Sequence, residues 1–87
     1  MSVYYLLHAN FLNSKTDEEK LFETIVKFES EKQFQMLNDH LFDTCHDCVS
    51  YNVPSDWCID ETPEAVRKVS EEEANEKGFV TYFEDGV

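Results

Sequence analysis

Two apolar runs near the N-terminus set the architecture of the chain: VYYLLHANFL at residues 3–12 and LFETIVKFE at residues 21–29. The first run contains two adjacent tyrosines and is rich in residues that favour extended backbone, so it predicts a strand. A polar, turn-like segment at residues 13–20 separates it from the second run.

The second run fits both a strand and a helix. As a strand, it alternates between an apolar face with Phe22, Thr24, Val26 and Phe28 and a charged face with Glu23, Lys27 and Glu29. As a helix, it would follow a capping box from Thr16 to Glu19 and carry an apolar stripe. The β-branched sequence Thr-Ile-Val favours the strand, and the helix is the alternative.

A helix is predicted to begin after Ser30, because Ser30 and Gln33 form a capping box. The apolar side chains that follow recur at helical spacing: Phe34, Leu37 and Leu41. Residues 49–53 then predict a short strand that Pro54 ends.

The C-terminal third contains signals for two further helix starts and the pattern of a final strand. A Thr-Pro pair ending at Pro63 places proline at a first helical position. Ser70 and Glu73 form another capping box, and Gly78 is a natural helix stop. Residues 79–83 alternate as a final strand would.

These elements predict one small α+β domain over residues 1–87, in the order β-β-α-β-α-β, with a mostly antiparallel sheet packed by one or two helices. The composition is 41% hydrophobic and 14% aromatic with two glycines and two prolines, which excludes a disordered tail. A chain this short has little room for both a core and a deep pocket. We therefore expect a functional site on the surface.

The charge of the chain excludes several classes of partner. It has 19 acidic and seven basic residues, and its net charge of −12 exceeds the about 2–8 that solubility calls for. Such a surface repels nucleic acid and anionic membranes and attracts basic patches. The N-terminus lacks the features of a secretion signal, and no apolar run reaches the about 18 residues of a membrane span, so we expect a cytoplasmic protein.

One segment, residues 33–66, contains no lysine or arginine and holds all three cysteines. Continuing the helix from Phe34 places Cys45 and Cys48 on its apolar stripe, which favours buried structural cysteines. The alternatives are redox chemistry and a zinc site built from His40, Cys45, Cys48 and Cys58. The acidic neighbours disfavour a reactive thiolate, and no second C-x-x-C pair is present. We expect neither a metal nor a cofactor.

The same helix would carry Asp39, Asp43 and Asp47, spaced by four residues, on the side opposite the apolar stripe. No lysine follows at the next helical turn to offset their repulsion. The predicted partner-binding surface consists of these three acids and the acids around the only tryptophan: Asp39, Asp43, Asp47, Asp56, Trp57, Asp60 and Glu61. Trp57 is read either as an interface anchor or as a core residue.

The chain has no glycine-rich phosphate loop, nucleophile motif or EF-hand pattern, so we expect no enzyme. Its composition, through the six acids of that surface, resembles small acidic inhibitors, often phage-encoded, that occupy the nucleic-acid channel of a host defence or transcription protein. Anti-restriction and anti-CRISPR proteins include several. The resemblance implies a nucleic-acid mimic that covers a basic surface of a partner protein in the cytoplasm of a host cell. The alternatives are a zinc-stabilised structural module and an adaptor that binds through Trp57, Tyr51 or an exposed sheet edge.

Overall fold

The computed structural model describes residues 1–38, 48–51, 53–61 and 63–82. Within these residues the chain forms a five-stranded sheet with two seven-residue helices and a helical turn at residues 48–50. The strands are β1 (Val3–Asn13), β2 (Glu19–Phe28), β3 (Trp57–Ile59), β4 (Glu64–Val69) and β5 (Val80–Thr81), and the helices are α1 (Glu31–Leu37) and α3 (Glu71–Lys77). The predicted α+β class with a mostly antiparallel sheet is confirmed. No helix in the described part of the chain has the length and apolar character needed to cross a membrane.

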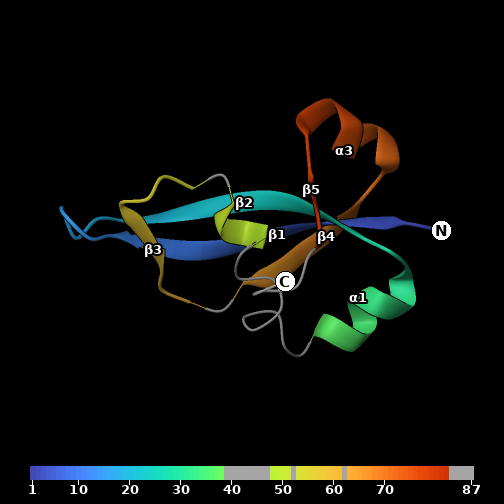
Figure 1. Ribbon diagram of the computed structural model, residues 1–87, viewed down its shortest axis with the longest axis horizontal. Coiled ribbons are helices and arrows are strands. Elements are labelled where there is room, and N and C mark those ends of the chain that lie inside the picture. Colours follow the sequence, from blue (N-terminus) through green and yellow to red (C-terminus); the bar gives the residue numbers. More distant parts are fainter. Residues whose placement is uncertain (39–47, 52, 62, 83–87) are drawn as a thin grey trace.

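Strand β1 is the centre of the sheet. It pairs antiparallel with β2 over almost its whole length, from Val3 opposite Phe28 to Leu12 opposite Glu19. Its other edge is shared by β3 and β4, which lie one after the other along it. Strand β5 pairs parallel with β2 only at Val26 and Lys27 (Figure 1).

The β1–β2 hairpin confirms both predicted strands, including the strand interpretation of residues 21–29. Its turn is built on Asn13, whose side-chain oxygen accepts hydrogen bonds from the N–H groups of Lys15 and Thr16 at 2.8 and 3.1 Å. Asp17 completes the turn in the left-handed region with φ 60°. Tertiary pairing along ten positions therefore decides between strand and helix for the second run.

The two faces of the sheet differ in what covers them. We call covered face the side that carries Tyr5, Leu7, Ala9 and Phe11 of β1 together with Val26 and Phe28 of β2. The main core forms there, under Phe34 of α1 and under Cys48 and Val49. We call open face the other side, where Tyr4, Ile25 and Val69 pack under Ala74 of α3 at one end only. In Figure 1, α1 and α3 accordingly lie on opposite sides of the sheet.

Both predicted serine caps are confirmed. The hydroxyl of Ser30 accepts a hydrogen bond from the N–H of Gln33 at 3.1 Å, and Ser70 does the same for Glu73 at 3.1 Å. Gly78 ends α3 with φ +89°, a backbone conformation that side chains disfavour. These signals are local, so they do not depend on the rest of the fold.

Two predicted elements are wrong. In the predicted strand at residues 49–53, the described residues 49–51 and 53 are not extended strand, since residues 48–50 are helical and Val49 is buried on the covered face. Both edges of β1 are already occupied, and a short apolar run fits a buried helical turn as well as a strand. Pro63 does not begin a helix but precedes β4, whose residues pair with the edge of β1 opposite β2.

The helix that begins after Ser30 is described as far as Asn38, its C-cap. Its predicted continuation through Leu41 and Cys45 lies outside the described residues. The final predicted strand is present as β5, in the shorter range Val80–Thr81.

Candidate protein-binding surface

The predicted binding residues fall in three places. Asp39, Asp43 and Asp47 lie outside the described residues, so their placement as one helical row stays a prediction. Trp57 lies on the covered side of β3, where it is half-buried and its ring meets Phe22 edge-on with centroids 5.4 Å apart. The remaining three, Asp56, Asp60 and Glu61, lie along the segment that passes the outer edge of β1.

Asp56 lies at the hairpin end of this segment. Its carboxylate is 3.4 Å from the ammonium group of Lys15, and both side chains are well exposed. Its backbone carbonyl accepts hydrogen bonds from the N–H and hydroxyl of Ser14 at 2.9 and 3.1 Å. Asp56 therefore joins β3 to the hairpin turn, and its charge has a cationic neighbour within the chain.

Asp60 and Glu61 connect β3 to β4 and are attached to Asn10 in the middle of β1. The N–H of Asp60 donates to the carbonyl of Asn10 at 2.9 Å, and the Asn10 side-chain amide donates to the carboxylate of Glu61 at 2.8 Å. Asn10 is on the open face, so its hydrogen bond holds the carboxylate of Glu61 over that face. Both acids are exposed.

The strand register places further acids beside Glu61. His8 is opposite Glu23 on β2 and opposite Glu64 on β4, and Leu12 is opposite Glu19. Residues opposite one another in an antiparallel pair project to the same side of the sheet. We call acidic face the outer half of the open face, which displays four exposed carboxylates around His8, Asn10 and Leu21: Glu19, Glu23, Glu61 and Glu64.

Sequence reasoning had selected only Glu61 of these four. Two signals for the others were available: Glu23 was assigned to the charged side of the second run, and Glu64 belongs to the segment without lysine or arginine. Neither signal shows which side of the strand stays uncovered. That depends on α3, which packs over Tyr4 and Ile25 and leaves the opposite end of the open face without a helix among the described residues.

The basic side chains near this surface are directed elsewhere. The ammonium group of Lys20 lies over the ring of Phe22, 5.1 Å from its centroid, and that of Lys27 lies over Phe79 at 5.9 Å. Among the described residues, no lysine or arginine is within salt-bridge distance of the four carboxylates, and the nearest titratable partner is His8, 3.4 Å from Glu64. The acidic face therefore presents charge that the described chain leaves largely uncompensated.

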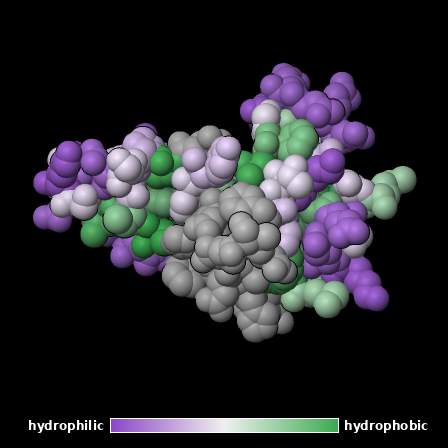
Figure 2. All heavy atoms as spheres, viewed as in Figure 1, coloured by the Kyte–Doolittle hydropathy of each residue, from purple (hydrophilic) through white to green (hydrophobic). Residues whose placement is uncertain are grey.

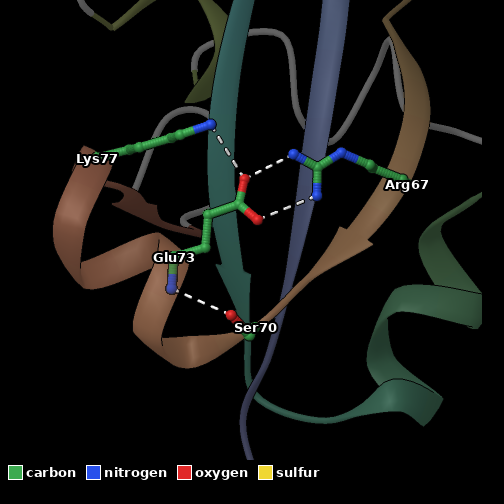
Figure 3. Close-up of polar contacts among 4 residues, drawn as sticks. All are labelled: Arg67, Ser70, Glu73 and Lys77. Carbon is green, nitrogen blue, oxygen red and sulfur yellow. Dashed lines mark hydrogen bonds and ion pairs between the residues drawn. The ribbon is translucent and has the colours of Figure 1, made fainter.

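Arg67 marks the border of the acidic face and is engaged by α3. Its two terminal nitrogens donate to the two carboxylate oxygens of Glu73 at 3.2 and 2.6 Å, and Lys77 adds a third contact at 3.2 Å (Figure 3). Hydrogen bonding from Arg67 is the main cause that lowers the pKa of Glu73 to about 2. Glu23 interacts with Arg67 only as a weaker, longer-range charge.

A groove separates α3 from the acidic face. It has a volume of ≈ 510 Å³, with Leu6 and Ile25 among its lining residues and Arg67, Glu73 and Lys77 at its polar side. Figure 2 shows hydrophilic side chains gathered over α3, over α1 and over the far end of the β1–β2 hairpin, with apolar side chains between α3 and the hairpin end. Because Glu23 is also among the residues that line the groove, the groove forms the inner limit of the acidic face.

The described cysteines do not converge. Cys48 is buried on the covered face, whereas Cys58 is exposed on the open face opposite Leu12. This placement argues against one zinc site that uses both, and the other two ligands of that alternative, His40 and Cys45, lie outside the described residues. Within the part of the chain that the structure describes, no group of three or more metal-ligating side chains is gathered.

Comparison of the chain with protein-family models, with curated proteins and with solved structures finds no match.

Proposed function

We propose that the protein is a non-enzymatic binding protein that uses its acidic face to cover a basic surface of a partner protein. The partner surface is of the kind that binds nucleic acid, so the chain acts as a competitor of DNA or RNA, in the manner of anti-restriction and anti-CRISPR inhibitors. One observation carries the proposal: four carboxylates, from β2, from β4 and from the connection between β3 and β4, share one sheet face on both sides of β1. Among the described residues, no helix covers this part of the face and no lysine or arginine is within salt-bridge distance of the four.

The rigidity of the array supports this function. Glu19 and Glu23 are four residues apart on one strand, which separates them by about 13 Å at the rise of an extended chain. Glu61 is held by Asn10, and Glu64 belongs to a paired strand. Because strand pairing already fixes the backbone at Glu19, Glu23 and Glu64, only their side chains must be ordered when a partner binds, which reduces the entropic cost of association.

The remaining charge supports long-range attraction. A net charge of −12 on 87 residues attracts basic surfaces and repels nucleic acid itself. Attraction of this kind is screened over about 10 Å at 0.1 M salt and over about 3 Å at 1 M salt. Binding is therefore expected to weaken steeply as salt increases.

The experiment compares two variants with the same change in net charge. The test variant carries four Glu→Gln changes on the acidic face, at Glu19, Glu23, Glu61 and Glu64. The matched control carries four Glu→Gln changes elsewhere, at Glu29, Glu71, Glu72 and Glu76, all of which are exposed. Circular dichroism first establishes that both variants fold.

Each protein is immobilised and challenged with a heparin-binding protein fraction from bacterial lysate at low salt, and partners are then purified individually. For a purified partner, the wild type and the control are expected to displace a fluorescent DNA or RNA duplex, and the test variant to need at least tenfold more protein. Equal displacement by both variants, or displacement that is unchanged between 0.05 and 0.5 M salt, would show the proposal to be wrong.

A further inference from the structure

Among the residues that the structure describes, the outer edge of β2 has no strand partner along most of its length. Strand β5 pairs with β2 only at Val26 and Lys27, at the end near α3 (Figure 1). From Glu19 to Ile25, no described strand pairs with this edge. Exposed edges of this kind are templates for pairing with another extended chain.

The direction of the backbone groups on this edge follows from two hydrogen bonds. The N–H of Tyr82 donates to the carbonyl of Lys27 at 2.9 Å, so the polar backbone groups of Lys27 point away from β1. At the other end, the N–H of Asn13 donates to the carbonyl of Glu18 at 2.8 Å, so the polar backbone groups of Glu18 point toward β1. Because these directions alternate along a strand, the N–H and C=O groups of Glu19, Leu21, Glu23 and Ile25 all point outward.

The side chains beside these groups select the charge of the incoming chain. Glu19, Leu21 and Glu23 are three successive open-face positions of β2, and all three are exposed. A second copy of this protein would bring its own acids beside them, and like charges on paired strands are destabilising. A strand with lysine or arginine at alternate positions would instead place opposite charges next to Glu19 and Glu23.

We propose that the edge of β2 from Glu19 to Ile25 binds an extended basic segment of the partner protein by strand addition. Backbone hydrogen bonds to Leu21 and Glu23 supply the pairing, and Glu19 and Glu23 select lysine or arginine at alternate positions of the segment. This inference rests on the proposed function, since it assigns part of the acidic face to a particular form of basic ligand.

The first test uses hydrogen exchange in the wild-type protein. The probe is a nine-residue peptide with blocked ends that alternates lysine and threonine. With saturating peptide, the outward amides of Leu21 and Glu23 are expected to exchange at least tenfold more slowly. The inward amides of Phe22 and Thr24, which face β1, are the internal control and are expected to change little.

The second test changes the peptide backbone and leaves its charge intact. Two versions are made, one N-methylated at every lysine and one at every threonine. Since alternate residues of a strand direct their N–H groups to the same side, only one version loses the donors that face β2. That version is expected to bind at least tenfold more weakly, while the other stays within about threefold of the parent.

The outcomes separate strand addition from charge attraction. Equal binding by the two N-methylated peptides, or unchanged exchange at Leu21 and Glu23, would overturn strand addition even if binding remains salt-dependent and needs the acidic face. If no peptide binds in a salt-dependent manner, and the acidic-face variant also competes with nucleic acid as well as its control, both proposals are wrong.

Discussion

Replacing Phe34 with alanine tests whether α1 closes the main core. The Phe34 ring stacks on Tyr5 with centroids 3.7 Å apart and planes 6° apart, meets Phe28 edge-on at 5.2 Å, and is 7% exposed. Core Phe→Ala changes cost about 3–5 kcal/mol. Because α1 is short and lies at the margin of the core, the gap can partly close, and we expect a loss of about 3 kcal/mol.

This loss is large against the whole stability of the domain. At about 0.05–0.15 kcal/mol per residue, a chain of this length is stable by about 4–13 kcal/mol. The Phe34→Ala variant should therefore remain folded at room temperature, with a melting temperature lower by about 12–24 °C. Phe34→Leu keeps most of the buried volume and should lose much less.

Urea unfolding measures the effect, followed by far-ultraviolet circular dichroism and by the fluorescence of Trp57. The slope of the unfolding free energy against urea should stay unchanged, because the surface exposed on unfolding is nearly the same. Met36→Ala on the same helix is the matched control, since Met36 is 70% exposed and should change stability by less than about 0.5 kcal/mol. Equal effects of the two alanine variants would refute the packing of α1 on the covered face.

Three further predictions concern single side chains. Hydrogen bonding from Arg67 is the main cause that lowers the pKa of Glu73 to about 2. The contribution of Glu73 to the free energy of unfolding is therefore present above its ordinary pKa of 4.5 and is lost as pH falls toward 2. Glu73→Gln should make the free energy of unfolding in urea less dependent on pH in that window. Burial, with a hydrogen bond to Glu31, raises the pKa of Tyr5 to about 12, so its contribution to the free energy of unfolding is present below pH 10 and is lost as pH rises from 10 to 12. Tyr5→Phe should remove a phenolate that forms near pH 12 from the ultraviolet absorbance titration. Gly78→Ala should lower the free energy of unfolding by about 1–3 kcal/mol in the same urea assay, because alanine is strained at φ +89°. No atom lies within 4 Å of the added carbon, so backbone strain is the expected cause of the loss. An unchanged free energy of unfolding would contradict this strain.

Local signals were predicted well from the sequence. The caps at Ser30 and Ser70 and the stop at Gly78 depend on a few neighbouring residues, and the structure contains all three. The alternation of the second run also favoured the strand that forms. The errors arose at residues 49–53 and after Pro63, where short segments adopt the conformation that pairing or burial against β1 allows.

In the candidate site, too, some residues could be selected from the sequence and others only from the tertiary structure. Sequence reasoning selected Asp56, Asp60 and Glu61 because they lie in a segment without basic residues, and Asp39, Asp43 and Asp47 lie outside the described residues. It did not select Glu19, Glu23 or Glu64, which are up to 45 positions apart in the chain and come together only through the register of β1 with β2 and β4.

The sequence by itself determined the net charge of −12, the alternation that makes the hairpin and the places where α1 and α3 begin. Each of these depends on composition or on residues within a few positions of one another. Only the tertiary structure decided which face of the hairpin the main core covers, which edge of β2 the described strands leave unpaired and which acids share a surface. The physical reason is that strand pairing and helix packing join distant segments, so the uncovered face is set by contacts that no local pattern contains.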